Sequence, residues 1–259
     1  MTREFRRLAL AAGDRIMEIY DSDDFEVKSK ADSSPVTEAD EAADALIGAG
    51  LRAAFPGMVL VTEEQTASHG EKADAFLIVD PLDGTREFIN RRGEFTVNIA
   101  YVENGFPVRG IVYAPALRRM FYTSEDGSAV EETDPRADRL GPRKPLRVSS
   151  PDNAALRVVA SKSHRDRATD DYIGQYAVKH AINAGSSLKF CLVAAGEADL
   201  YPRLGRTMEW DTAAGHAVLA AAGGDVVRFD DHRPLRYGKA GYANSFFVAY
   251  APGVDLKRA

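Results

Sequence analysis

The stretch that most constrains the fold is FLIVDPLDGT, at residues 76–85. Its four leading apolar residues predict a buried strand, because a short apolar run bounded by a turn is typical of one. Two carboxylates, Asp80 and Asp83, follow, and the Pro-Leu pair between them together with Gly84 predicts a tight turn. The turn would direct both carboxylates and the Leu82 carbonyl toward one point. Oxygen ligands of this kind suit a hard divalent cation such as Mg²⁺.

A helix is predicted to begin directly after this turn, at Thr85, with Asp83 as its N-cap. The exposed N–H groups at a helix start commonly bind phosphate. Metal-binding oxygens beside an anion site indicate phosphate chemistry. The simpler alternative is a strand–turn–helix corner in which Asp83 serves only as the cap.

Composition bounds the class of protein. The chain has 259 residues, of which 45% are hydrophobic, enough for one large domain or two small ones that share a core. Its formal net charge of −6 gives no general attraction to nucleic acid. No apolar run approaches the ~18 residues of a membrane span, and no signal-peptide pattern opens the chain. The single cysteine, Cys191, excludes an internal disulfide and fits packing in a reducing compartment, so we expect a soluble cytoplasmic protein.

Apolar periodicity predicts helices and strands along the whole chain. Helices are expected over 4–20, 38–55 (capped by Thr37), 169–176, 187–195 and 212–222, and strands over 25–30, 58–62, 76–80, 95–102, 108–114, 120–124, 157–160, 179–183, 199–201, 225–229 and 246–249. Residues 32–35 are expected to form a turn, 65–73 a mobile surface loop and 131–145 a connecting loop. The prediction is an α+β half over residues 1–145 and an α/β half over 146–259, packed as layers of helix and sheet.

Further acids stand at the ends of other predicted elements. Taken alone, Asp40 is a first-turn acid that the helix dipole favours. Taken alone, the pair Glu63 and Glu64 forms a solvated turn, and Asp211 is a helix N-cap. If these acids met the Asp80–Asp83 pair, they would repel one another strongly unless cations neutralised them. Two cations a few ångströms apart could hold a phosphate and generate hydroxide from water.

Three segments resemble the signature motifs of the inositol monophosphatase superfamily, which are Mg²⁺-dependent, lithium-sensitive phosphatases. They are DPLDGT at 80–85, the Glu63-Glu64 pair and WDTAAG at 210–215. Segments 35–40, 86–89, 93–100 and 185–191 resemble more narrowly its CysQ branch, the bacterial 3′(2′),5′-bisphosphate nucleotidases. The resemblance covers nearly the whole chain and implies the layered αβαβα sandwich of sugar phosphatases. One departure is Thr62, where many members have Gly or Ser, and we expect no loss of metal from it.

The resemblance implies roles for the acids. The metal ligands, for two or three Mg²⁺ ions, would be Glu63, Asp80, the Leu82 carbonyl, Asp83 and Asp211. The water-activating pair would be Thr85 and Asp40, with the Asp40 carboxylate accepting from the Thr85 hydroxyl, which orients or deprotonates the attacking water. Attack on phosphorus in line with the leaving oxygen needs no phosphoenzyme. Ca²⁺ and Li⁺ are expected to inhibit.

The resemblance also implies a substrate, 3′-phosphoadenosine 5′-phosphate, converted to AMP and phosphate in the recycling of a sulfur-assimilation by-product. The residues expected to contact it are Glu63, Leu82, Asp83, Gly84, Thr85 and Asp211 in the metal site, with His164, Ser186, Lys189 and Arg203 in the second half. Ser186 and Lys189 lie one turn apart at a predicted helix start, so both could reach one phosphate. The alternatives are a turn residue for His164, a solvated helical lysine for Lys189 and a surface charge for Arg203.

Three rival functions remain open. An inositol or other sugar phosphatase would share the metal chemistry. A haloacid-dehalogenase-like phosphatase is disfavoured because its two acids are two residues apart, whereas Asp80 and Asp83 are three apart. A non-enzymatic metal- or RNA-binding protein would need neither Thr85 nor Asp40. The expected partner is a small nucleotide rather than a nucleic-acid polymer, and the expected state is a monomer, with a dimer as the alternative. Peripheral association with the inner face of the cytoplasmic membrane is compatible with the resemblance.

Overall fold

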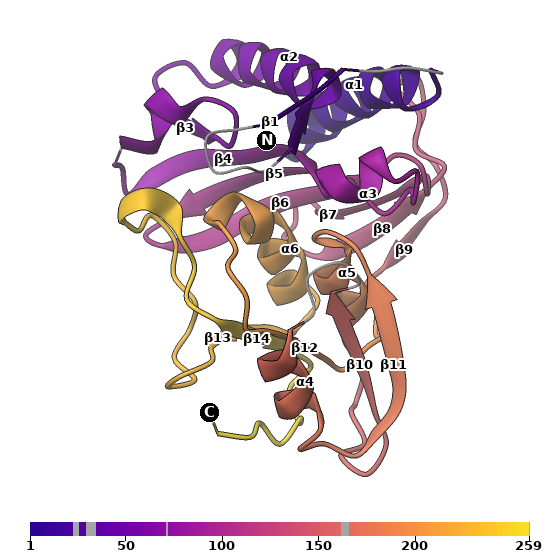
Figure 1. The fold of residues 1–259 in the computed structure, drawn as a ribbon. Coiled ribbons are helices and arrows are strands. Elements are labelled where there is room, and N and C mark those ends of the chain that lie inside the picture. Colours follow the sequence, from indigo (N-terminus) through magenta and orange to yellow (C-terminus); the bar gives the residue numbers. More distant parts are fainter. Residues whose placement is uncertain (23–25, 30–34, 71, 162–165, 259) are drawn as a thin grey trace.

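The computed structural model describes residues 1–22, 26–29, 35–70, 72–161 and 166–258. These residues form five layers in the order helix, sheet, helix, sheet, helix (Figure 1). The expected layered fold is therefore confirmed. The N-terminal part of the chain builds the upper layers of the figure and the C-terminal part the lower ones.

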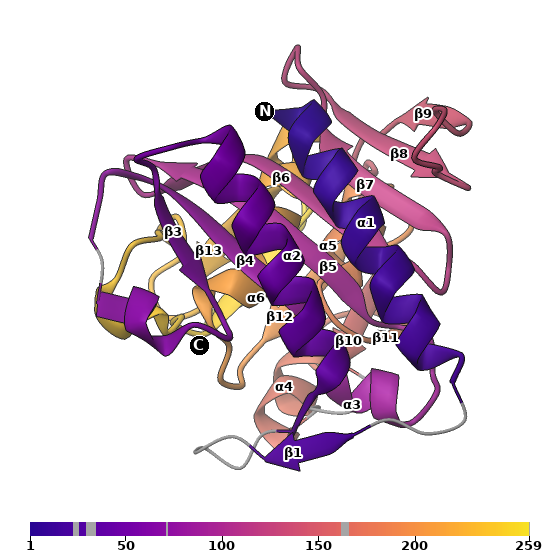
Figure 2. The same cartoon turned by 90° about the horizontal axis from the view of Figure 1, so that it is seen from above.

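The first layer consists of helices α1 (Thr2–Tyr20) and α2 (Glu38–Ala54), which lie side by side across one face of the larger sheet (Figure 2). Their apolar faces share one core with that sheet. Thr37 caps α2 as predicted, because its hydroxyl oxygen accepts from the Ala39 N–H at 3.2 Å. Of the predicted turn at 32–35, residues 32–34 lie outside the described residues, and Pro35 begins strand β2 (Pro35–Thr37), which pairs with β1 (Val27–Ser29).

The second layer is a seven-stranded sheet whose strands lie in chain order. The strands are β3 (Val59–Thr62), β4 (Ala75–Asp83), β5 (Thr96–Glu103), β6 (Phe106–Ala114), β7 (Arg119–Thr123), β8 (Ala129–Thr133) and β9 (Arg143–Pro145). Strand β3 pairs with β4 in parallel, and the other pairs are antiparallel. The pairing of β4 with β5 shifts register between Asp80 and Asp83, and an irregularity of this kind re-aims side chains.

The connecting loop predicted for residues 131–145 is shorter than expected: residues 134–142 connect β8 to β9, and the two ends of the segment are strand. Glu131 and Glu132 lie in β8 and are almost completely buried. Their charges are paired: Arg119 and Lys144 approach the Glu131 carboxylate at 2.6 and 2.7 Å, and Arg6 approaches that of Glu132 at 2.6 Å. A run of charges can therefore belong to a buried strand when each acid has a cationic partner, and the sequence pattern does not show this pairing.

The third layer lies between the two sheets and contains α5 (Leu188–Ala194) and α6 (Glu209–Ala221). Two glycines allow α6 to approach its neighbours closely. A Cβ on Gly110 of β6 would lie 2.5 Å from the Ala214 carbonyl oxygen, and a Cβ on Gly215 would lie 2.7 Å from the Phe190 ring. Both distances are much shorter than a van der Waals contact. Helix α6 can therefore take this position only because these two residues are glycines and carry no Cβ.

The fourth layer is a five-stranded mixed sheet with the order β11-β10-β12-β14-β13. Its strands are β10 (Leu156–Ser161), β11 (Val178–Ala184), β12 (Leu200–Arg203), β13 (Asp225–Arg228) and β14 (Phe247–Tyr250). Helix α4 (Arg167–Ile173) and the C-terminal segment pack on its outer face and form the fifth layer. Three short helices remain: η1 (Thr66–Gly70), α3 (Thr85–Ile89) and η2 (Ala240–Tyr242).

The two sheets follow one another along the chain. The larger sheet ends at Pro145 and the smaller begins at Leu156, but one core cluster joins Val112 of the first to Phe247 of the second through Val218 of α6. The predicted division into halves at residue 145 stays a prediction, because this shared core shows no independent folding of either half.

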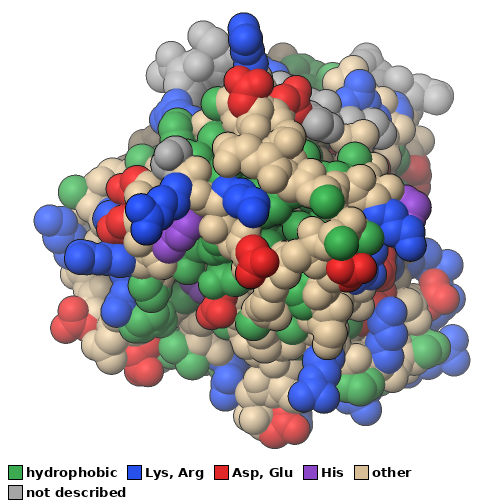
Figure 3. All heavy atoms as spheres, turned by 90° about the horizontal axis from the view of Figure 1, so that it is seen from below, with side chains coloured by type: hydrophobic (Ala, Val, Ile, Leu, Met, Phe, Trp, Pro, Cys, Tyr) green, Lys and Arg blue, Asp and Glu red, His purple; other side chains and the backbone are tan. Residues whose placement is uncertain are grey.

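On the side seen in Figure 3, basic and acidic side chains are interspersed among apolar and neutral ones. None of the helices that the structure describes is both long and apolar enough to cross a membrane.

The close approach of α6 to β6 predicts that Gly110→Ala is destabilising. Its methyl group would meet the backbone of Ala214, which cannot rotate away, so we expect a loss of about 1–3 kcal/mol in the free energy of unfolding. Denaturant unfolding followed by circular dichroism measures this loss. Gly174→Ala is the matched control, because Gly174 has a φ of −62° and only ordinary contacts. Equal stability of the two variants would contradict the packing argument.

Candidate active site

A cavity of about 270 Å³ opens where β4, α3, α5 and α6 meet. It brings together ten of the predicted site residues: Glu63, Asp80, Leu82, Asp83, Gly84, Thr85, Ser186, Lys189, Arg203 and Asp211. Asp40 lies behind the cavity wall in contact with Thr85. His164 lies outside the described residues.

Three of the acids converge from separate elements. Glu63 follows the end of β3, Asp80 lies in β4 and Asp211 lies in the first turn of α6, and each offers a carboxylate oxygen within 4.8 Å of the others. The Glu63 N–H donates to the Val79 carbonyl at 3.1 Å, which continues the pairing of β3 with β4 past the end of the strand. Carboxylate oxygens at this spacing fit a hard divalent cation.

Asp83 belongs to the same cavity but does not cap α3, so the cap predicted from the sequence is wrong. Gly84 is the N-cap, with a φ of +96°, and a Cβ there would lie 2.7 Å from the Ser186 hydroxyl. The Asp83 carboxylate turns instead toward α5. Its Oδ2 atom accepts from the Ser187 N–H at 2.6 Å and from the Asn98 side chain at 3.4 Å.

The electrostatics of these acids favour a bound cation. Burial raises the pKa of Asp83 to about 6, against the attraction of Lys189. Burial also raises the pKa of Asp211, and the nearby charges of Asp83 and Glu63 raise it further. Each shift means that the ionised group is unfavourable in the site on its own. A divalent cation would offset both the desolvation and the mutual repulsion, so the donor set fits a metal centre.

Asp40 and Thr85 form a hydrogen-bonded pair beside the acids. Asp40 is buried in the first turn of α2, where its Oδ2 atom accepts from the N–H and the hydroxyl of Thr37 at 2.7 and 2.6 Å. Its Oδ1 atom accepts from the Thr85 hydroxyl at 3.2 Å. The same hydroxyl lies 3.4 Å from the Leu82 carbonyl oxygen. The acid therefore orients Thr85 in addition to stabilising the helix start.

Asp211 is not the N-cap of α6 as the sequence alternative had it, because Met208 is the N-cap, but Asp211 still bonds the helix start. Helix α6 begins at Glu209, three residues earlier than predicted, so Asp211 lies inside the first turn. Its Oδ2 atom accepts from the Met208 N–H at 2.8 Å, which satisfies a backbone donor at the helix start. The carboxylate also belongs to the acid cluster, so the helix-terminal role and a ligand role are compatible.

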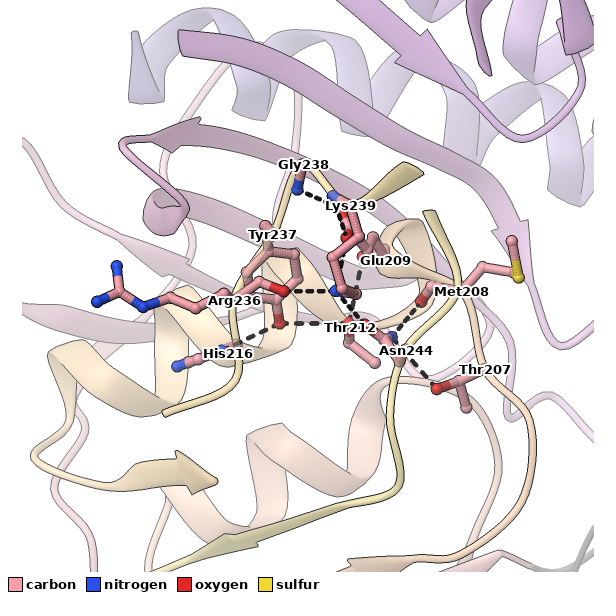
Figure 4. A network of polar contacts seen from close by, with 10 residues as sticks. All are labelled: Thr207, Met208, Glu209, Thr212, His216, Arg236, Tyr237, Gly238, Lys239 and Asn244. Carbon is pink, nitrogen blue, oxygen red and sulfur yellow. Dashed lines mark hydrogen bonds and ion pairs between the residues drawn. The ribbon is translucent and has the colours of Figure 1, made fainter. Parts of the chain in front are cut away.

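A polar network holds the start of α6 in place (Figure 4). The fully buried Glu209 carboxylate accepts from the Gly238 and Lys239 N–H groups at 2.6 and 3.0 Å and pairs with the Lys239 ammonium at 2.6 Å. The Asn244 side chain donates to the Met208 carbonyl at 2.7 Å. Through these contacts, segment 236–244 holds in place the turn that carries Asp211.

The cavity is also lined by basic residues. They are Arg86, Lys189, Arg203 and Arg206. Lys189 is only 4% exposed, so the alternative of a solvated lysine is wrong. Its ammonium donates to the Ser186 and Ala184 carbonyls at 2.5 and 3.3 Å, and burial lowers its pKa to about 8. The half-buried Arg203 donates to the Arg206 carbonyl at 3.1 Å.

Ser186 does not lie on a helix, contrary to the prediction. Helix α5 begins at Leu188, and Ser186 precedes it with a φ of +47°. Its hydroxyl lies 2.9 Å from the Asp83 carbonyl and 2.8 Å from the Glu94 carbonyl, to one of which it donates. Ser186 therefore joins the β4 turn to the turn before α5.

Sequence reasoning missed three residues that hold Asp83. The Ser187 hydroxyl donates to the side-chain Oδ1 atom of Asn98 at 2.7 Å and lies 2.9 Å from the Thr96 hydroxyl, while the Asn98 side-chain amide donates to the Asp83 carboxylate. A signal was present, because Thr96 and Asn98 alternate with apolar residues on a strand that lies inside the sheet. Buried polar side chains on such a strand need partners, and here the partner group is part of the site.

Comparison with known proteins agrees with this geometry. The sequence profile of the inositol monophosphatase family matches residues 1–250. A curated relative in Escherichia coli (strain K12), named 3′(2′),5′-bisphosphate nucleotidase CysQ, is 46% identical over 237 residues, which cover 89% of this chain and 91% of the relative. One of the same name in Buchnera aphidicola is 38% identical over 251 residues, covering 95% and 91%.

The solved structures lead to the same family. The crystal structure of CysQ from Bacteroides thetaiotaomicron, described as a bacterial member of the inositol monophosphatase family, superposes with a TM-score of 0.81 at 37% identity. The superposition covers 96% of this chain and 97% of that one. A Thermotoga maritima IMPase superposes with a TM-score of 0.78 at 27% identity, covering 96% of this chain and 91% of that one. This chain belongs to the inositol monophosphatase family.

Proposed function

We propose that this protein is a Mg²⁺-dependent phosphatase that removes the 3′-phosphate of 3′-phosphoadenosine 5′-phosphate and gives AMP and phosphate. The observation that carries the proposal is one cavity lined both by the acid cluster and by four basic side chains. The acids suit a metal-activated phosphate, and the basic residues suit a second phosphate on the same substrate. The names of the curated relatives support this choice.

The alternative is an inositol or other sugar phosphatase. A substrate with one phosphate and a neutral polyol would bring no negative charge to Arg86, Lys189, Arg203 and Arg206. The bisphosphate has a second phosphate whose negative charge these basic residues can bind, so they favour the nucleotide as substrate. A purely metal-binding protein is disfavoured because it would need no hydroxyl and carboxylate pair of the kind that Thr85 and Asp40 form.

The residues that would hold Mg²⁺ are Glu63, Asp80, Asp83 and Asp211, with the Leu82 carbonyl as a further oxygen ligand. When bound there, the cation supplies Lewis-acid activation of the phosphate and of water. Hydrogen bonds to backbone N–H groups orient three of these carboxylates: Asp80 accepts from Leu82, Asp83 from Ser187 and Asp211 from Met208. The protein thus supplies a preorganised set of oxygens.

Thr85 and Asp40 would position the attacking water. Because the Thr85 hydroxyl donates its proton to Asp40, its oxygen can accept a hydrogen bond from water. That bond aims the water oxygen at phosphorus, and the buried Asp40 carboxylate is the acceptor toward which a proton can pass. No side chain needs to form a bond to phosphorus.

We infer that the nucleotide is a small-molecule partner and that the enzyme works in the cytoplasm. The only cysteine, Cys191, is buried, and burial raises the pKa of its thiol, so it fits packing rather than redox or nucleophilic chemistry.

The substrate preference is the most direct test. The purified protein should release phosphate from 3′-phosphoadenosine 5′-phosphate with a much higher kcat/KM than from inositol 1-phosphate, because only the first has a second phosphate for the basic residues of the cavity. A phosphate-release assay at saturating Mg²⁺ measures both. Faster turnover of inositol 1-phosphate would overturn the substrate assignment and leave the metal chemistry standing.

Thr85→Ala tests the water-positioning pair. The variant should lose about 10²–10⁴-fold in kcat, the usual contribution of acid–base assistance, while Mg²⁺ affinity stays close to that of the parent protein. Thr85→Ser is the control, since it keeps the hydroxyl and should retain most of the activity. Parental kcat in Thr85→Ala, where chemistry limits the rate, would exclude Thr85 from this role.

Arg203→Ala tests the second phosphate site. Loss of a charged hydrogen bond should lower kcat/KM for the bisphosphate about tenfold to a hundredfold, mainly through KM, and change turnover of 3′-AMP little. Lys189→Ala is expected to impair both substrates, because the Lys189 ammonium also holds the carbonyls of the turn before α5. If Arg203→Ala lost kcat/KM equally on both substrates, Arg203 would have no role in recognising the second phosphate.

The raised carboxyl pKa values predict an unusual pH dependence. Between the ordinary pKa of 3.8 and the folded-state pKa of about 6, Asp83 binds more protons in the folded than in the unfolded chain. The Asp83 contribution to metal-free stability should therefore fall as pH rises through this interval, and Mg²⁺ should restore it above about pH 6. Thermal unfolding at pH 5 and 7.5, with Mg²⁺ or chelator, should show a Mg²⁺ effect that grows with pH. Asp83→Asn should reduce that growth, and an unchanged profile would contradict the assignment.

A further inference from the structure

Helix η1 folds back onto the end of strand β3, immediately before Glu63. The Thr62 N–H donates to the Ser68 hydroxyl at 3.2 Å, and the Gln65 N–H donates to the Thr62 hydroxyl at 3.2 Å. The His69 Nε2 atom lies 2.8 Å from the Thr62 carbonyl oxygen. A carbonyl oxygen can only accept, so His69 carries a proton on Nε2. The surface loop predicted over 65–73 therefore contains, at residues 66–70, a short helical turn attached to β3.

The ring of His69 also contacts the start of α6. It stacks on the Trp210 ring with a centroid distance of 4.7 Å and an interplanar angle of 26°. The Tyr242 ring of η2 lies beside both, with centroids 6.4 Å from His69 and 6.2 Å from Trp210. The three rings join η1, α6 and η2 into one aromatic group.

These two contacts give one side chain an unusual position. His69 hydrogen-bonds the residue directly before Glu63 and stacks on the residue directly before Asp211. We infer that His69 is a positioning residue that bridges the β3 end and the α6 start and thereby sets the spacing of the Glu63 and Asp211 carboxylates. The inference rests on the metal site of the proposed function.

The bridge matters because the two carboxylates come from different layers of the fold. Glu63 follows an edge strand of the larger sheet, whereas Asp211 lies on the central helix. The α6 start is already held by segment 236–244 through Glu209 and Asn244 (Figure 4). The α6 start is therefore fixed in position, and the His69 ring holds the end of β3 against it.

A bridge that acts on ligand spacing should change metal affinity more than chemistry. His69→Ala removes both the hydrogen bond and the ring stack. We expect its Kd for Mg²⁺ to be about tenfold higher than that of the parent protein, a loss of about 1.4 kcal/mol in binding free energy. His69→Phe keeps a ring on Trp210 but loses the donor, so its Kd should lie between those of the parent protein and His69→Ala. At saturating Mg²⁺ the kcat of both variants should approach the parental value.

Calorimetric titration of the full chain with Mg²⁺ alone measures these affinities without any substrate. His180→Ala is the matched control, because His180 is exposed on β11, and its Kd should equal that of the parent. Metal-free thermal unfolding of each variant shows whether the fold is retained, which we expect because His69 is only half-buried on a short turn.

The bridge is supported if the Kd for Mg²⁺ rises from the parent protein to His69→Phe and rises again from His69→Phe to His69→Ala. A Mg²⁺ affinity unchanged in His69→Ala overturns it, as does a His69→Phe variant that is indistinguishable from the parent or as weak as His69→Ala. Should His69→Ala fail to fold, the Kd of His69→Phe relative to the parent decides alone. The proposed function fails separately, through absence of bisphosphate turnover by the parent protein, and the metal titrations are unaffected by that result.

Discussion

Mutual repulsion among buried carboxylates is the constraint on which this structure depends. Ionised acids gathered within a few ångströms are unfavourable in a partly buried site, and the raised pKa values of Asp83 and Asp211 express that cost. The fold counters it by hydrogen-bonding three of the four acids to backbone donors: Asp80 to Leu82, Asp83 to Ser187 and Asp211 to Met208. These bonds fix the carboxylate planes before a cation arrives, so little ordering remains when it binds.

Helix α6 links this site to the stability of the whole molecule. It lies between the two sheets, approaches β6 over Gly110 and packs on α5 over Gly215. The same helix carries Trp210 and Asp211 at its start, where segment 236–244 grips it. A change in how deeply α6 sits between the sheets would therefore also move Asp211 relative to the ends of β3 and β4. Core packing and metal geometry are coupled through one rigid element.

Much of this arrangement could be predicted from local sequence. The apolar run before Asp80 gave a strand in the right place, and the Thr37 cap of α2 is confirmed. The errors have physical causes. Glu131 is assigned to a connecting loop because its partners, Arg119 and Lys144, lie on neighbouring strands, and Asp83 is assigned as a cap because its true donor, Ser187, is 104 residues away in sequence. Local patterns report local hydrogen bonds, whereas the contacts that complete this site come from distant parts of the chain.

The turn before α5 connects a metal-binding carboxylate to a basic residue of the cavity. The Ser187 N–H of this turn donates to the Asp83 carboxylate, and the Ser186 hydroxyl lies against the Asp83 carbonyl. Two residues further on, the Lys189 ammonium donates to the Ser186 carbonyl. A group that drew the Lys189 ammonium toward a phosphate would loosen its hold on this turn and so act on a metal-binding carboxylate. Occupation of the basic residues and the geometry of the metal-binding carboxylates are therefore physically linked through this turn.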